Sequence, residues 1–140
     1  GKVPLFGYIY SRLHILVDRR DKESKKETVE RSKEAIDKGI NLIIFPEGTI
    51  PKHHNPHLIE FKDGAFKIAI EKQIPIVPVT MPYNFKILPD QHKMKAFPHE
   101  CRVIFHEPIE TKGMSLENAS ELKDKVYNII HSELKKYSVI

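Results

Sequence analysis

The sequence has a single cysteine, Cys101, among its 140 residues, so it holds no internal disulfide framework. A lone cysteine fits a reducing compartment, and beside a strand-like run we expect Cys101 to be a small buried hydrophobe. No apolar run approaches the roughly 20 residues that a membrane-spanning helix needs. The chain also lacks a Gly-x-Ser-x-Gly elbow and a Walker-type phosphate loop, so the sequence indicates neither a serine hydrolase nor a P-loop nucleotide site.

The composition favours one folded domain over residues 1–140, because 40% of the residues are hydrophobic and 30% are charged. The formal net charge is +4 and the sequence pI is about 9.1. This mild excess suits an anionic partner, such as a phosphorylated metabolite or an anionic bilayer surface. No basic run alternates with aromatic residues, so nucleic acid is not indicated as a partner.

The stretch from Asn41 to Thr49 organises the sequence. Its apolar, mostly branched residues predict a strand buried on both faces, and Pro46 ends the strand because it has no N–H to donate. Gly48 permits a tight turn that carries the side chains of Glu47 and Thr49. In open α/β sheets ligands bind beyond the carboxyl ends of strands, so this turn is a candidate site. Alternatively, it is a structural turn in which Glu47 caps nearby backbone N–H groups.

Two helices flank this stretch. Ser24 and Glu27 form a capping-box pattern that predicts a helix to about Lys38, with Gly39 as the residue after its C-cap. We expect the ion pairs Glu27/Arg31 and Glu34/Lys38 on its surface. A second helix is predicted over Phe61–Lys72, with Lys62 in its first turn, where a cation is unfavourable unless an anion lies nearby.

The remaining pattern predicts three further strands and a long final helix. The strands are Leu13–Val17, Ile74–Val79 and Arg102–Phe105, and the two prolines of the second favour an edge strand or a bulge. Residues 81–98 have little periodicity and are expected to form a loop. Ser115 opens the last helix, whose apolar stripe comprises Leu116, Ala119, Leu122, Val126, Ile129 and Ile130. This order predicts an α/β fold with a mostly parallel or mixed sheet flanked by helices.

Three other groups of polar residues have spacings that bear on a site. Arg19 and Arg20 follow the first strand, where guanidinium groups could meet a phosphate or simply be solvated. His53, His54 and His57 lack a carboxylate at metal-site spacing and are separated by Pro56, so no metal site is predicted there. His14 and Asp18 would share one strand face as a His/Asp dyad, but the pattern favours strand residues with unrelated partners.

Four segments resemble, in order, the blocks of the 1-acyl-sn-glycerol-3-phosphate acyltransferase family of glycerolipid acyltransferases. They are Ile15-Leu16-Val17-Asp18-Arg19, Phe45-Pro46-Glu47-Gly48-Thr49, Phe61-Lys62-Asp63-Gly64-Ala65-Phe66 and Ile74-Pro75-Ile76-Val77-Pro78-Val79. The resemblance covers about Pro4 to Tyr83. It implies transfer of an acyl chain from acyl-CoA or acyl carrier protein to the sn-2 hydroxyl of lysophosphatidic acid, without a cofactor.

The family's general base is the histidine of an Asn-His-x4-Asp block, which is absent from this sequence and is expected upstream of Gly1. The resemblance therefore implies the carboxyl-terminal portion of an acyltransferase domain, inactive alone. It implies an acceptor-phosphate site formed by Arg19, Glu47, Gly48, Thr49 and Lys62, and no metal. Ile50 stands where the family usually has arginine, so Lys52, Lys62 or Arg20 would substitute, or the acceptor is another lysolipid.

The resemblance also implies association with the cytoplasmic face of a membrane, where the lysolipid acceptor resides. Phe6, Tyr8 and Tyr10 lie in an apolar opening segment that could contact a bilayer or pack against protein. A second hypothesis is a non-catalytic module that binds a lipid phosphate through Arg19 and Lys62.

Overall fold

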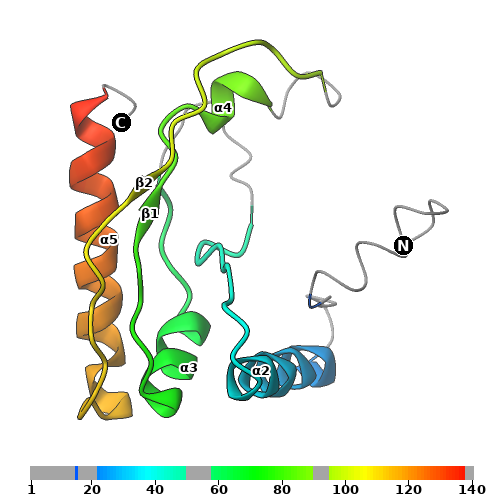
Figure 1. Cartoon of the computed structure of the whole chain (residues 1–140), viewed down its shortest axis with the longest axis vertical. Coiled ribbons are helices and arrows are strands. Elements are labelled where there is room, and N and C mark those ends of the chain that lie inside the picture. The colour runs from blue at the N-terminus through cyan, green and yellow to red at the C-terminus, as the bar shows by residue number, and fades with distance from the viewer. Residues whose placement is uncertain (1–14, 16–21, 50–57, 90–94, 138–140) are drawn as a thin grey trace, which may run out of the picture. The chain divides into compact units, whose positions relative to one another are not determined.

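The computed structural model describes residue 15 and residues 22–49, 58–89 and 95–137 (Figure 1). Its contacts divide the chain into two units, one ending at Ile44 and the other running from Phe45 onward. The elements in chain order are α2 (Lys22–Asp37), α3 (Gly64–Lys72), β1 (Val79–Thr80), α4 (Asn84–Ile87), β2 (Ile104–Phe105), the 3₁₀ helix η2 (Leu116–Asn118) and α5 (Ala119–Lys136). Among these residues, no helix is long and apolar enough to cross a membrane.

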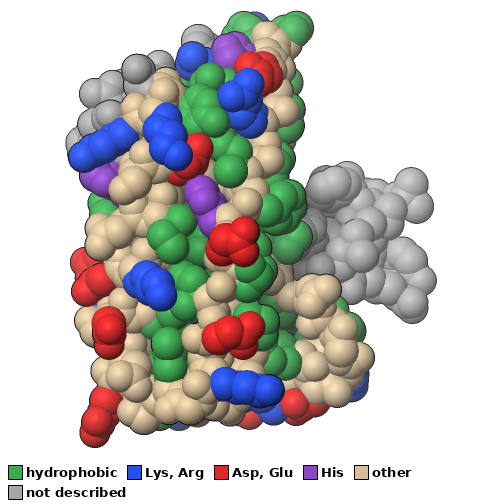
Figure 2. All heavy atoms as spheres, turned by 60° about the vertical axis from the view of Figure 1, so that its left-hand side comes forward, with side chains coloured by type: hydrophobic (Ala, Val, Ile, Leu, Met, Phe, Trp, Pro, Cys, Tyr) green, Lys and Arg blue, Asp and Glu red, His purple; other side chains and the backbone are tan. Residues whose placement is uncertain are grey.

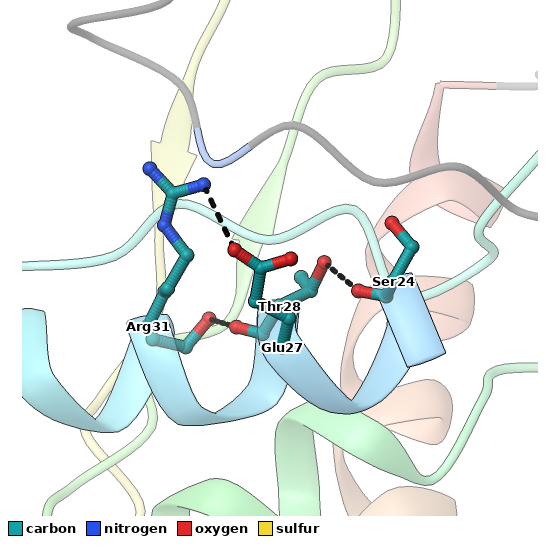
Figure 3. Close-up of polar contacts among 5 residues, drawn as sticks. Ser24, Glu27, Thr28 and Arg31 are labelled. Carbon is teal, nitrogen blue, oxygen red and sulfur yellow. Dashed lines mark hydrogen bonds and ion pairs between the residues drawn. The ribbon is translucent and has the colours of Figure 1, made fainter. Parts of the chain in front are cut away.

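Helix α2 confirms the predicted first helix but begins before its predicted cap. Because the helix starts at Lys22, Ser24 lies inside the first turn, and its carbonyl accepts a hydrogen bond from Thr28 Oγ1 at 2.7 Å (Figure 3). The predicted capping box is therefore wrong. The Glu27–Arg31 ion pair is present at 3.9 Å, as Figure 3 shows, whereas Lys38 lies beyond the helix end.

The carboxyl end of α2 is a Schellman motif, as Gly39 predicts. Gly39 has a φ of +77° and donates its N–H to the Ile36 carbonyl at 2.8 Å, and the Ile40 N–H reaches the Ala35 carbonyl at 3.0 Å. Glycine adopts this left-handed conformation without the steric cost that a Cβ adds, so it ends the helix at this point.

The predicted buried strand at Asn41–Phe45 is wrong. These residues form no strand with any described residue, and Ile43 and Phe45 are 90% and 68% exposed. The apolar composition was interpreted as burial on both faces, but burial also requires neighbouring strands on each side. The first predicted strand lies outside the described residues, apart from Ile15. The aromatic opening segment Val3–Tyr10 also lies outside them.

The unit from Phe45 onward is built around α5, which packs against α3 and against strand β1 of a short antiparallel sheet (Figure 1). Its core consists of Phe61, Phe66, Ile70, Ile109, Ala119, Leu122 and Val126. The final helical segment begins after Ser115, as the sequence predicts, and the structure adds a capping box between Ser115 and Asn118. Helix α5 buries Ala119, Leu122 and Val126 of the expected stripe, and Ile129 and Ile130 are half-buried. Leu116 is an exception, since it is 51% exposed in η2.

Strands β1 and β2 are shorter than predicted. Val79 pairs with Phe105 and Thr80 with Ile104, and a separate bridge joins Ile76 to Ile109. Residues 77–78 therefore face residues 106–108, and this extra residue is a bulge of the kind that Pro75 and Pro78 favour. The sequence predicts a mostly parallel or mixed sheet. In the described ranges the structure instead has one small antiparallel sheet of two strands.

Two smaller predictions in this unit are wrong. Residues 81–98 are expected from the sequence to form a loop, yet they contain the short helix α4. Its C-cap residue Leu88 donates its N–H to the Asn84 carbonyl at 2.9 Å. Cys101 is exposed rather than buried. It precedes β2 in a segment that is exposed from Lys95 to Val103, so its strand-like neighbours do not place it in the core.

Candidate functional site

The Pro-Glu-Gly segment forms a tight turn. The Gly48 N–H donates to the Phe45 carbonyl at 3.1 Å, which closes the turn, and Gly48 has a φ of +67°. Proline at the second position and glycine at the fourth are residues that such turns favour. The predicted turn is therefore present, although it follows an exposed segment instead of a buried strand.

Two hydrogen bonds attach this turn to the segment before α3. The Lys62 N–H donates to the Pro46 carbonyl at 2.8 Å, and the Ile59 N–H donates to the Glu47 carboxylate. A Cβ added at Gly48 would lie 3.6 Å from Lys62 Cγ. Three of the predicted site residues, Glu47, Gly48 and Lys62, are thus neighbours in space. Glu47 also bonds backbone N–H, as the alternative interpretation of a structural turn expects.

The segment is fixed from behind by α3 and α5. Phe61 is buried and contacts the Tyr127 ring edge-on, with 5.2 Å between centroids. Tyr127 donates its hydroxyl to the Leu58 carbonyl at 3.5 Å, and Lys123 forms an ion pair with Asp63 at 2.9 Å. These contacts hold the backbone on which Lys62 stands.

The charges around Lys62 are partly balanced. Burial raises the pKa of Glu47, and the Ile59 N–H offsets part of that rise. The hydrogen bond from Lys123 holds the pKa of Asp63 below its ordinary value, so Asp63 is ionised at neutral pH. Lys62 is exposed and forms no salt bridge with any described residue; its Cγ lies beside Gly48, and its charge contributes to the lowered pKa of Asp63.

A shallow hollow near this segment is lined by Glu60, Phe61, Lys123, Asp124 and Tyr127. Its carboxylates already engage Lys123, because Asp63, Glu60 and Asp124 all raise the pKa of that ammonium. An incoming phosphate would meet uncompensated negative charge there. The electrostatics therefore favour the Lys62 side of the segment for an anion.

Lys62 precedes α3 by two residues instead of occupying its first turn, so that prediction is wrong. Asp63 takes the N-cap position, but its carboxylate bonds Lys123 and makes no cap hydrogen bond. Sequence reasoning missed Lys123 and Tyr127 entirely. Both are 60 residues or more along the chain from their partners in the segment before α3, and no local sequence pattern predicts such a pairing.

Other predicted site residues are not placed. Arg19, Arg20, Lys52, the pair His14 and Asp18, and the histidines at 53, 54 and 57 lie outside the described residues, so their roles stay predictions. Thr49 is described and exposed. Among the residues the structure describes, no three His, Cys, Asp or Glu side chains converge as metal ligands would.

Comparison with known proteins defines the family. The sequence profile of the Acyltransferase family matches residues 1–82, and this chain belongs to that family. The chain is 34% identical over 108 residues to the chloroplastic 1-acyl-sn-glycerol-3-phosphate acyltransferase BAT2 of Brassica napus, which covers 76% of the chain and 31% of the relative. It is 31% identical over 143 residues to a putative 1-acyl-sn-glycerol-3-phosphate acyltransferase of Caenorhabditis elegans, covering 98% and 49%.

A solved structure has the same fold. The chain superposes on the 1-acyl-sn-glycerophosphate acyltransferase PlsC from Thermotoga maritima with a TM-score of 0.75 and 23% identity, covering 99% of this chain and 54% of that one. The resemblance recognised in the sequence is therefore confirmed at the level of family and fold. The chain spans between about a third and a half of the length of these relatives.

Proposed function

We propose that the chain is the carboxyl-terminal portion of a 1-acylglycerol-3-phosphate O-acyltransferase of phospholipid synthesis. In the proposed reaction the sn-2 hydroxyl oxygen of lysophosphatidic acid attacks the thioester carbonyl of acyl-CoA or acyl carrier protein. A new C–O bond forms, the C–S bond breaks, the base takes the hydroxyl proton, and the thiolate leaves and is reprotonated. The products are phosphatidic acid and the free thiol. The names of the relatives support this reaction.

The contribution that we assign to this chain is binding of the acceptor phosphate. The observation that carries the proposal is the attachment of the Pro-Glu-Gly turn to the backbone of Lys62 at 2.8 Å. This bond holds the backbone of the exposed Lys62 against the turn of the family's Phe-Pro-Glu-Gly-Thr block, with the Lys62 Cγ beside Gly48. The half-buried Glu47 shapes the turn through Ile59 and leaves the phosphate to the cations. Arg19 and Thr49 complete the proposed site.

A binding experiment tests the role of Lys62. Short-chain lysophosphatidic acid, below its micellar concentration, is titrated into the chain by calorimetry. We expect Lys62→Gln to weaken binding about tenfold, which matches the roughly 1.5 kcal/mol of one charge-assisted hydrogen bond. Lys67→Gln is the matched control, since Lys67 is an exposed lysine five residues away that already lies 3.9 Å from Asp63. Equal weakening by both variants would show that general charge, not this site, binds the ligand.

The location of the base makes a separate prediction. We propose that the His/Asp pair is supplied by sequence upstream of Gly1, so the 140-residue chain alone should not transfer acyl groups. A coupled thiol-release assay with acyl-CoA and lysophosphatidic acid checks this directly. Turnover by the isolated chain would refute the assignment. Turnover by the product of the complete gene would support it. We place the reaction on the cytoplasmic face of a membrane.

A non-catalytic module that binds lipid phosphates is the second candidate. Ile50 favours it, because this position lacks the guanidinium that usually meets the phosphate in the family. The same observation is compatible with an acyltransferase for another lysolipid. An Asn-His-x4-Asp block in the gene upstream of Gly1 favours the enzyme, whereas its absence favours the module.

A further inference from the structure

Three apolar side chains are exposed together around α4. Phe85, Leu88 and Phe97 are 36%, 51% and 42% exposed. Phe85 and Leu88 are three residues apart, on α4 and at its C-cap, so they lie on one side of the helix. The Phe97 N–H donates to the Ile87 carbonyl at 2.8 Å, which sets residues 95–97 alongside the end of α4. Single exposed apolar residues are ordinary, but a contiguous group indicates an interaction site.

Two lysines accompany this apolar group. The Lys86 ammonium lies 5.0 Å from the centre of the Tyr83 ring and 5.8 Å from that of Phe85. Lys95 is exposed, and within the described ranges neither lysine is in a salt bridge with a carboxylate. Nearby Glu100 is neutralised by Arg102 Nε at 2.7 Å. We call Phe85, Lys86, Leu88, Lys95 and Phe97 the α4 patch, and its charge is positive.

The α4 patch stands on a packed base. Tyr83 contacts Tyr137 edge-on at 5.8 Å and the His99 ring at 5.1 Å, while Pro82 is fully buried. Arg102 lies 5.3 Å from the centre of the Tyr137 ring. Figure 1 places α4 at the end of this unit where α5 terminates, and in the upper part of Figure 2 cationic side chains lie beside hydrophobic ones, with acidic and histidine side chains among them. The exposed side chains are therefore presented by a fixed surface.

We propose that the α4 patch docks on an anionic lipid bilayer. Aromatic and leucine side chains enter the headgroup region while lysines reach the lipid phosphates, which is the chemistry that interfacial protein segments use. A nucleic acid would require a longer track of cations than two lysines provide. The inference rests on the proposed function, because the lysolipid acceptor of the proposed reaction resides in a membrane and gives the chain a reason to bind one. It differs from the predicted contact through Phe6, Tyr8 and Tyr10, which lie outside the described residues.

The absence of tryptophan from the sequence makes a direct test possible. Phe85→Trp introduces a single fluorophore into the α4 patch, and Phe105→Trp introduces one at a 72% exposed aromatic position on β2 as the matched control. Each variant of the 140-residue chain is titrated with equimolar phosphatidylcholine–phosphatidylglycerol vesicles and with pure phosphatidylcholine vesicles. We expect the emission of Trp at position 85 to shift to shorter wavelength with the anionic vesicles only, and that of the control to stay unchanged.

Charge variants test the lysines in the Phe85→Trp background. Because a basic residue near an anionic surface contributes about 1 kcal/mol, Lys86→Gln and Lys95→Gln should each weaken vesicle binding about fivefold. The exposed lysines 112 and 125, changed to Gln, are controls away from α4 and should leave binding within about twofold under the same estimate. Circular dichroism verifies that each variant keeps its helix content.

Every other result overturns the proposal. An absent shift at position 85 refutes bilayer docking, an equal shift with neutral vesicles refutes the role of lipid charge, and an equal shift of the β2 control indicates unspecific adsorption. Self-association of the chain without any response to vesicles would assign the patch to protein contacts. The vesicles contain neither lysophosphatidic acid nor a thioester, so these outcomes are independent of whether the proposed acyl transfer occurs.

Discussion

Helices α2 and α5 have similar lengths but are stabilised in different ways. Helix α5 has 18 residues and buries Ala119, Leu122, Val126 and Leu134. Helix α2 has 16 residues, and among those whose burial is described only Ser32 is buried. The Ser32 hydroxyl donates to the Thr28 carbonyl at 2.8 Å, so even this inner position is satisfied by the helix itself. Helix α5 thus packs through contacts distant in sequence, whereas the contacts of α2 that the described residues reveal are local ones.

The largest expected effect concerns the core of α5. Leu122→Ala removes a side chain that is 2% exposed, and it should lower the free energy of unfolding by about 2–5 kcal/mol, because it leaves a cavity in the packed cluster. The comparison helix supplies Ile36→Ala, a half-buried position where we expect less than about 1.5 kcal/mol. Urea unfolding followed by circular dichroism measures both. Similar losses would mean that α2 is as well packed as α5.

Hydroxyl-to-methyl changes sharpen the contrast. Thr111 is fully buried and donates its hydroxyl to the Ile74 carbonyl at 2.8 Å, which ties the chain after Ile109 to the end of α3. Thr111→Val should cost about 1–2 kcal/mol because buried carbonyl oxygens lose their donor. In α2, Thr28→Val should cost about 0.5 kcal/mol or less, since the Ser24 carbonyl keeps access to water. The order of the two losses in urea unfolding decides the prediction.

Glycine positions give a smaller, local effect. Gly39→Ala should destabilise the end of α2 by about 1 kcal/mol, because its φ of +77° is costly for a residue with a Cβ. Gly64→Ala at the start of α3 should instead stabilise by up to about 1 kcal/mol, as no atom beyond its chain neighbours and its own helix backbone lies within 4 Å of the added Cβ. Amide hydrogen exchange resolved by residue reports on each helix. We expect the two substitutions to change helix stability in opposite directions. A loss of stability with Gly64→Ala would contradict this prediction.

The smallest effect is the dependence of stability on pH. The lowered pKa of Asp63 means that its ion pair with Lys123 contributes above the ordinary aspartate pKa and is lost as pH falls through the folded value. Glu47 has the opposite sign, because its raised pKa favours the protonated form in the folded state. Asp63→Asn should therefore flatten the acid limb of the stability curve, measured by thermal unfolding between neutral and acid pH. Glu47→Gln should steepen it.

The parts of the fold that the sequence predicts are those set by local physics. The stripe of α5, the start of the final helix at Ser115 and the turn glycines Gly39 and Gly48 each depend on neighbours within a few residues, and each is found. The strand at Asn41–Phe45 was predicted from composition, but strand formation depends on partners that composition does not specify. For the same reason the proximity of Glu47 to Lys62 followed from the resemblance to a family, while the Lys123–Asp63 bond was not predictable at all.

The side chain of Gln73 holds two distant pieces of backbone together. In the left-handed conformation at the end of α3, it donates to the carbonyls of Ile70 and Met114 at 2.7 and 3.1 Å, and its oxygen accepts the Gly113 N–H at 2.6 Å. Together with the hydrogen bond of Thr111, these contacts of Gln73 join the two ends of a segment of about 40 residues that includes α4. Doubling such a loop costs only about 0.6 kcal/mol in closure entropy. Insertions around α4 are therefore energetically cheap, which makes this loop the segment where related chains can diverge in length without disturbing the core.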